Sequence, residues 1–161
     1  MRRITPEASE TLFDTATTRT LEQRAAATLA PHALMARAGD AVARLARALH
    51  PHARRIWVAC GPGNNGGDGL IAALHLHRSA VNGWPEVTVT HHAQADRLPD
   101  DARWALAQAR AVGVRFADQA PDAPDLVIDA RGPRPDTALA VAAGLPLGHS
   151  GGIAVDAWHR T

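Results

Sequence analysis

The chain contains no lysine and no tyrosine, and only one of its 161 residues is a cysteine. Without a lysine it cannot complete the phosphate-binding motif of a P-loop, so a P-loop nucleotidase is excluded. The single cysteine, Cys60, excludes a framework of internal disulfides. Aromatic residues make up 4% of the chain, the net charge is +1, and the arginines are scattered. No electrostatic footprint or stacking platform for nucleic acid is present.

Long apolar runs are also missing. Residues 1–9 lack the apolar core of a signal peptide, and no stretch has the length of a membrane span. These absences predict a cytoplasmic protein with no membrane and no nucleic-acid partner. With 46% hydrophobic residues, a chain of 161 residues can bury one core, so we predict a single domain over residues 1–161.

The most informative stretch is residues 56–70, IWVACGPGNNGGDGL. Residues 56–59 are β-branched, aromatic or small, which predicts a buried strand, and the glycines and proline of residues 61–63 end it. Apolar residues return at helical spacing after Asp68. The sequence therefore predicts that the glycines lie in a strand-to-helix loop, which is where α/β folds bind ligands.

Two interpretations of this loop are open. In the first, glycine backbone and the amides at a helix start attract phosphate, and Asn64, Asn65 and Asp68 supply oxygens for a hard cation or for ribose hydroxyls. In the second, the loop is only a turn followed by a helix N-cap. Two asparagines and an aspartate within so few residues favour the first interpretation.

The loop nominally matches the Rossmann fingerprint at Gly61, Gly63 and Gly66. The acidic ribose anchor of that fingerprint would fall near residues 87–91, where the sequence VTVTH has no carboxylate. Dinucleotide binding in the ordinary Rossmann manner is therefore not supported.

The rest of the chain alternates predicted helices and strands. Helical spacing indicates two helices within residues 9–49, the second of which begins at Pro31. Further on, the pattern predicts strands at 87–90, 114–116 and 125–128, a turn at 82–85, and a helix at 100–112 that Gly113 ends. This alternation predicts an α/β fold: a three-layer α/β/α sandwich with a mostly parallel, Rossmann-like sheet and an N-terminal helical arm. The ends of three strands, at Cys60, His91 and Asp129, should share one edge.

Three segments, in the same order along the chain, resemble the NAD(P)H-hydrate epimerase family, the YjeF N-terminal domain. They are GPGNNGGDG at 61–69, ALMARAGDA at 33–41, similar to the family's LM-x-x-AG segment, and LVIDA at 126–130, similar to a later strand that ends in an aspartate. The resemblance covers about residues 9–156. It implies an isomerase that interconverts the R and S epimers of hydrated NADH and NADPH in metabolite repair.

The resemblance also implies a set of site residues. Asn65 and Asp129 would hold a potassium ion, and Asp129 would be the catalytic residue beside the reacting centre. One carboxyl group that gives and takes a proton at the C6 hydroxyl of the substrate would suffice for epimerisation. The implied substrate contacts, together with two arginines that can meet a pyrophosphate, are Asn64, Asn65, Gly66, Gly67, Asp68, Arg131, Arg134 and Asp156.

The C-terminal part departs from the family pattern. After Asp129 the family has a longer Gly-rich loop, whereas this chain continues with Ala-Arg-Gly-Pro-Arg-Pro. Residues 153–156, IAVD, resemble the next strand, but the Pro-Ser-Gly that follows in the family is replaced. The domain is incomplete relative to the family.

Two main hypotheses follow. The first is an active NAD(P)H-hydrate epimerase that works beside an ATP/ADP-dependent NAD(P)H-hydrate dehydratase domain or protein. The second is a catalytically inactive, shortened relative or fragment that acts as a nucleotide-binding or interaction module. A generic α/β phosphate binder is a third possibility. Because a shortened sheet leaves an exposed edge that a partner subunit can cover, we also predict a homodimer.

Overall fold

The computed structural model describes residues 13–132, 136–148 and 151–156. Its helices are α1 (Thr15–Ala26), α2 (Ala33–Leu49), α3 (Asn64–Arg78), α4 (Asp100–Ala111) and α5 (Ala138–Ala142), with a 3₁₀ turn, η1, at Ala95–Arg97. Its strands are β1 (Arg55–Cys60), β2 (Glu86–His91), β3 (Arg115–Ala117) and β4 (Leu126–Ala130). The strands form one parallel sheet in the order β3-β2-β1-β4. The predicted α/β class with a parallel, Rossmann-like sheet is confirmed.

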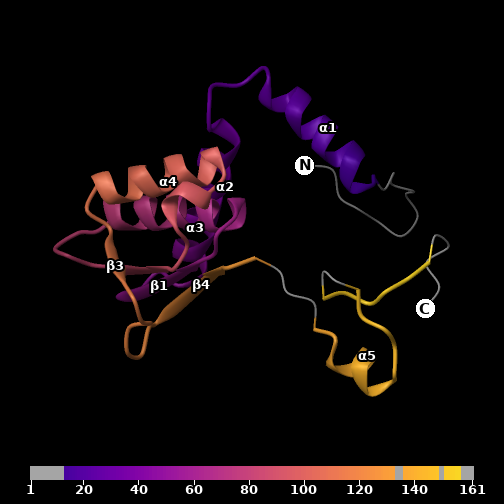
Figure 1. Ribbon diagram of the computed structural model, residues 1–161. Helices are drawn as coiled ribbons and strands as arrows, with labels where there is room; N and C mark the ends of the chain where they lie inside the picture. Colours follow the sequence, from indigo (N-terminus) through magenta and orange to yellow (C-terminus); the bar gives the residue numbers. More distant parts are fainter. Residues whose placement is uncertain (1–12, 133–135, 149–150, 157–161) are drawn as a thin grey trace, which may run out of the picture.

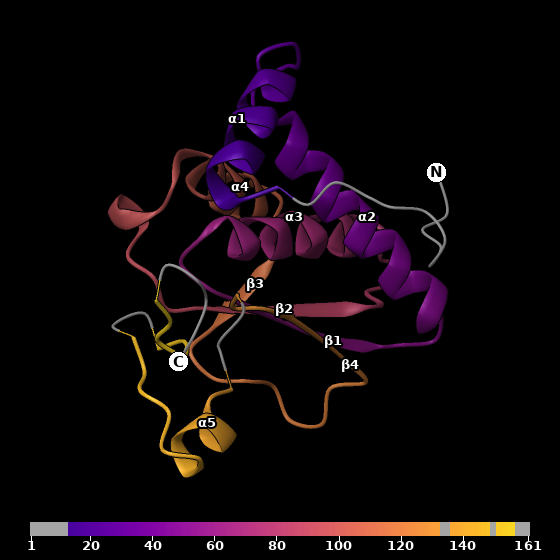
Figure 2. The ribbon, with the colours of Figure 1, turned by 90° about the vertical axis from the view of Figure 1, so that its right-hand side faces the viewer.

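Helix α3 is the centre of the core. It lies over the sheet between α2 and α4, as Figures 1 and 2 show. Six successive or near-successive positions of the helix are buried because it meets other elements on three sides; they are Leu70, Ile71, Ala72, Ala73, Leu74 and Leu76. The strands meet them with alternate residues, Ile56 and Val58 from β1 and Val87 and Val89 from β2.

The start of α3 corrects the prediction of a strand-to-helix loop at the glycines. The helix begins at Asn64, so Gly66 and Gly67 lie inside its first turns. A Cβ at Gly66 would stand 2.0 Å from the backbone oxygen of Gly61, and one at Gly67 would stand 2.4 Å from the Sδ of Met35. Glycine is disfavoured inside isolated helices, but here close packing outweighs its low propensity.

The helices α2, α3 and α4 all cover the same face of the sheet (Figure 2). On the opposite face, β1 presents Trp57, whose indole nitrogen donates to the Thr90 hydroxyl at 3.0 Å. On β4, Val127 is 47% exposed on that face. In the described part of the chain, the sheet and the layer formed by α2, α3 and α4 are thus two of the three predicted layers.

The N-terminal arm extends from this body (Figure 1). None of the residues of α1 is buried, and Asp14 caps the helix by accepting the Thr17 amide at 2.7 Å. Helix α2 starts at Ala33, two residues after the predicted Pro31, because His32 adopts a left-handed conformation with φ of 62°. A residue in that conformation cannot continue an α-helix, so it becomes the N-cap.

The predicted strand at residues 153–156 is wrong. Ile153 forms only an isolated antiparallel bridge with Leu147. The Gly148 amide donates to the Gly152 oxygen at 2.8 Å, and the Ala154 amide donates to the Pro146 oxygen at 2.8 Å. These local bonds satisfy the backbone in a small hairpin, so the segment does not join the sheet.

Asp125 links the N-terminal ends of β1 and β4. One of its carboxylate oxygens accepts the backbone amides of Arg54 and Arg55, each at 2.8 Å, and these two bonds are the main causes that lower its pKa. We therefore expect Asp125→Ala to lower the thermal midpoint at neutral pH. A lowered carboxyl pKa stabilises the fold above the ordinary value of 3.8, and this contribution is lost as the pH falls below it.

Thermal unfolding of Asp125→Ala and of the wild type across this pH range checks the expectation. Asp122→Ala, in the same exposed loop, is the matched control because its side chain makes no such bonds to the β1 amides. A difference in thermal midpoint between Asp125→Ala and the wild type that stays constant down to strongly acidic pH would contradict the proposed role of the charged carboxylate.

Among the described residues, no helix combines the length and the apolar character that crossing a membrane requires. The prediction that residues 1–161 form one domain stays a prediction.

Candidate functional site

The candidate site lies at the carboxyl edge of the sheet. The last residue of β1, Cys60, is in register with His91 of β2 and Ala130 of β4. The Gly61 amide donates to the Ala130 oxygen at 3.1 Å, so the chain leaves β1 directly beside the exit from β4. A pocket of about 350 Å³ opens here, and its lining consists of Cys60, Gly61, Pro62, His92, Ala93 and Arg131. Its size is within the usual range of small-molecule sites.

The start of α3 borders this pocket. Asn64 and Asn65, both predicted site residues, are exposed there. The first hydrogen bond of the helix runs from the Gly67 amide to the Gly63 oxygen. The backbone amides that precede Gly67 therefore have no acceptor within the helix. A helix N-terminus of this kind attracts phosphate or another anion.

The remaining predicted residues of the motif are buried or half-buried in the fold. Gly66 is buried against Gly61, and Gly67 is buried against Met35. Asp68 is half-buried, and its burial, followed by the nearby Asp101 carboxylate, raises its pKa. These three residues therefore pack α3 into the fold, and their predicted contact with substrate stays a prediction.

Asp129 lies inside β4 rather than after it, in register with Ala59. Because side chains alternate along a strand, it projects from the opposite face to Ala130 and Cys60. Its carboxylate binds Arg131 in a two-pronged ion pair, with Nε to Oδ1 at 2.9 Å and Nη2 to Oδ2 at 2.7 Å. The Arg131 amide also donates to Oδ1 at 3.1 Å. Asp129 and Arg131 are thus brought together beside the pocket.

This geometry does not fit the predicted potassium ion. A hard cation needs oxygen ligands, and both oxygens of Asp129 already accept N–H groups of a cationic side chain. The Asp129 carboxylate in turn raises the pKa of Arg131, so the guanidinium stays charged. Potassium at Asn65 and Asp129 therefore stays a prediction from the resemblance alone.

The other two predicted substrate contacts are Arg134 and Asp156, and neither is found at the carboxyl edge among the residues that the structure describes. Arg134 lies outside the residues that the structure describes. Asp156 is exposed on the segment that follows α5, which lies away from the sheet in Figure 1. The structure therefore does not bring Asp156 to the carboxyl edge.

His91 is a half-buried residue at the carboxyl end of β2. Its Nε2 atom is buried without a hydrogen-bond partner among the described residues. Burial, followed by Arg110 and His92, lowers its pKa, which favours the neutral imidazole. Its position at a strand end was the only signal in the sequence.

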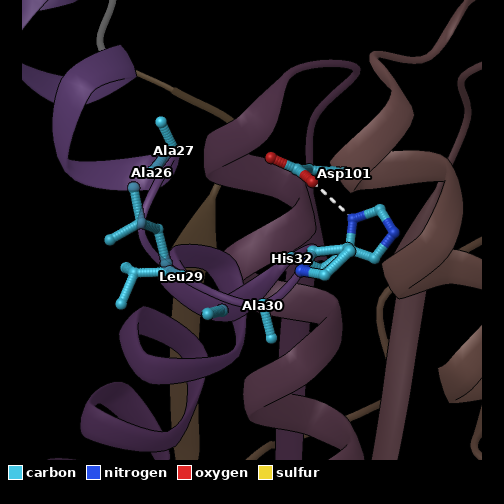
Figure 3. A pocket seen from close by; sticks show the side chains of 9 residues that line it. Ala26, Ala27, Leu29, Ala30, His32 and Asp101 are labelled. Carbon is cyan, nitrogen blue, oxygen red and sulfur yellow. Dashed lines mark hydrogen bonds and ion pairs between the residues drawn. The ribbon is translucent and has the colours of Figure 1, made fainter.

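A second hollow lies where the turn after α1 meets α4 (Figure 3). His32 Nδ1 and Asp101 Oδ1 are 2.5 Å apart, and the imidazole stacks on Trp104 with 4.6 Å between ring centroids. The hollow has a volume of about 370 Å³ and mostly alanine and leucine walls. Sequence analysis missed this pair because its members are 69 positions apart and belong to no motif.

Taken together, the parallel sheet, the Gly-rich start of α3 and the charged pair at the carboxyl edge define a domain of the α/β class whose candidate site lies beyond the strand ends. A model of the family described as YjeF-related protein N-terminus matches residues 31–131. The chain belongs to this family, as the sequence predicts.

Individual relatives agree. An NAD(P)H-hydrate epimerase of Rhodobacter capsulatus is 44% identical over 107 residues, which are 60% of this chain and 49% of the relative. One of Bordetella pertussis is 44% identical over 98 residues, with 60% of this chain and 41% of the relative covered. A bifunctional NAD(P)H-hydrate repair enzyme of Pyrobaculum aerophilum is 59% identical over 44 residues, which are 27% of this chain and 9% of that protein.

The crystal structure of yeast ynu0, YNL200c, has a similar fold. It superposes with a TM-score of 0.60 at 19% identity and covers 83% of this chain and 64% of that one. At this identity the likeness supports the fold alone. The chain spans about half the length of the two curated epimerases described above. Their names therefore do not by themselves establish the activity of this chain.

Proposed function

We propose that this chain is an NAD(P)H-hydrate epimerase, an isomerase that interconverts the R and S epimers of hydrated NADH and NADPH. The observation that carries the proposal is that the family match spans the Gly-rich start of α3, Asp129 and all the residues that line the pocket at the strand ends. Relatives at 44% identity over the same region are named as this enzyme.

The described residues supply the parts that such a reaction needs. The amides at the start of α3 attract the phosphates of the nucleotide, and the pocket beside Gly61 and Arg131 receives its reacting ring. In this proposal the Asp129 carboxylate, which Arg131 holds in place, takes the proton of the C6 hydroxyl. As the C6 oxygen becomes a carbonyl, the C6–N1 bond breaks and its electron pair passes to N1, which takes the proton from Asp129. N1 then attacks the other face of the carbonyl, its proton returns to the oxygen through Asp129, and the other epimer forms.

A second candidate function is a nucleotide-binding or interaction module without turnover. One observation favours it: the Asp129 carboxylate is already engaged by Arg131. This candidate predicts binding of the hydrated nucleotide with no conversion of one epimer into the other.

One assay separates the two. The R epimer of hydrated NADH is supplied to the purified chain together with a dehydratase that consumes only the S epimer. Consumption of the R epimer beyond the uncatalysed rate supports the epimerase. Calorimetric binding of the hydrated nucleotide without consumption supports the module, and absence of both contradicts the two proposals.

The partners are proposals of the same kind. The name of the Pyrobaculum relative, a bifunctional repair enzyme, supports an ATP/ADP-dependent NAD(P)H-hydrate dehydratase as a partner domain or protein. A cytoplasmic location is consistent with that repair role and stays a prediction.

A homodimer is supported by apolar side chains on elements with little packing of their own. Phe13 is 55% exposed, Leu21 on α1 is 43% exposed, and no residue of α1 is buried. A helix of this length is marginal in water unless its apolar side packs against something. Sedimentation analysis of the purified chain is expected to give twice the chain mass, and a monomer at all concentrations would contradict the proposal.

A further inference from the structure

At the end of β4, the Asp129 carboxylate binds a cation that belongs to the same chain, the Arg131 guanidinium. Arg131 is two residues after Asp129, so the chain turns back and the guanidinium meets the carboxylate edge to edge. The Arg131 amide donates to Oδ1 as well, which fixes the turn that presents the side chain. Three N–H groups of one residue therefore bind the two oxygens of Asp129. A two-pronged contact of this kind is the strongest arrangement between arginine and a carboxylate.

This arrangement competes directly with a metal ion. An alkali ion at Asp129 must either displace the guanidinium or sit beside it, where two positive charges repel each other. The guanidinium is tethered at short range, so its effective concentration at the carboxylate is far higher than that of a dissolved ion. The hydrogen bond to the neighbouring carboxylate also raises the pKa of Arg131, which favours the charged guanidinium.

We propose that the Arg131 guanidinium takes the place of an alkali cation at Asp129, so that this chain neither binds potassium there nor needs it for turnover. The statement about turnover rests on the proposed epimerase function, whereas the statement about binding does not. In the catalytic case, Arg131 provides the positive charge next to the reacting centre and keeps Asp129 oriented and ionised.

Binding is tested first, on the full chain, with potassium and thallium(I) as probes. Thermal unfolding is compared in potassium, sodium and choline chloride at equal ionic strength, and thallium NMR reports direct occupancy. The wild type is expected to show the same midpoint in all three salts and no thallium signal that potassium competes away. Because both side chains of the pair are more than half exposed, substitutions there should not prevent folding.

The decisive variant is Arg131→Met, which keeps a long side chain but removes the cation and its donors. We expect this variant to gain a midpoint increase specific to potassium and a thallium signal, because the guanidinium that competes with the ion at Asp129 is gone. The double variant Asp129→Asn with Arg131→Met is the control and should lose both responses. Two results would overturn the proposal: potassium binding by the wild type that Asp129→Asn abolishes, or an Arg131→Met variant as insensitive to potassium as the wild type.

The activity test uses the same salts. The wild type should epimerise at the same rate in potassium and in choline, while Arg131→Met should be slow in choline and faster in potassium. A wild type that needs potassium contradicts the inference. If no salt supports turnover, the epimerase proposal fails, but the binding measurements still decide whether Arg131 replaces the ion.

Discussion

The substitution Asp129→Asn is expected to lower the epimerisation rate by about 100-fold or more, the usual contribution of a positioned acid or base. An asparagine keeps the shape of the side chain but cannot take the C6 hydroxyl proton. It also removes the charge that holds the Arg131 guanidinium. The coupled assay with the R epimer measures the rate, and circular dichroism with thermal unfolding measures the fold. The Asp129 side chain is 54% exposed, so we expect little change in stability.

A matched control separates the loss of the proton acceptor from the loss of a negative charge. Asp118 is an exposed aspartate that follows β3, at the opposite side of the sheet from β4. The variant Asp118→Asn should therefore retain the wild-type rate. If Asp129→Asn also retained the wild-type rate, Asp129 would have no part in proton transfer. If both variants lost activity equally, overall charge and not the site would be the cause.

The fold was predictable where local patterns and tertiary packing agree. The apolar run of β1, the alanine-rich helix α4 and its stop at Gly113, which has φ of 83°, all lie within a few residues of their predicted places. The turn before β2 is also as expected, with left-handed backbone at Asn82 and Gly83. Each of these signals depends on residues close together in the chain, so the sequence contains the information.

The errors occur where long-range packing overrides the local signal. Glycine is disfavoured in an isolated helix, so the glycines after β1 indicated a loop. Gly66 and Gly67 are nevertheless helical, and glycine is needed there because Gly61 and Met35 leave no room for a side chain. The apolar run before Asp129 ends at Ile128, yet β4 continues to Ala130 because it pairs with β1 as far as Cys60. Alternation then places Asp129 on the opposite face to Cys60 and His91.

The candidate site was predicted in its residue types more than in its geometry. The motif identified Asn64, Asn65 and Asp129, and the structure places the first two at the start of α3, beside the pocket that Arg131 lines. The ion pair between Asp129 and Arg131 was not foreseen, because an arginine two residues after an aspartate is equally compatible with a solvent-exposed side chain. The pair of His32 and Asp101 was also not foreseen, since its members are 69 positions apart in the chain.

The substitution Gly66→Ala is expected to lower the free energy of unfolding by about 3 kcal/mol, at the upper end of the range for overpacking. The added Cβ would stand 2.0 Å from the Gly61 oxygen, with the Gly61 carbon and nitrogen at 2.8 and 2.9 Å. All three are backbone atoms, so no side-chain rotation relieves the clash. Alanine gains about 1 kcal/mol of helix propensity over glycine, which offsets only part of the penalty. Urea unfolding measures the difference.

The control for Gly66→Ala is Gly63→Ala, three residues earlier in the same motif. A Cβ at Gly63 would have no heavy atom within 4 Å, and its φ of −110° is open to any residue. Stability should therefore stay close to the wild type, because the less flexible unfolded chain of the alanine variant is offset by the loss of glycine at the N-cap of α3. Because Gly61 contacts the backbone of Arg131, the clash at Gly66 should also displace the pair formed by Arg131 and Asp129 and reduce turnover. A Gly66→Ala variant as stable and active as Gly63→Ala would mean that Gly66 does not pack against the Gly61 backbone.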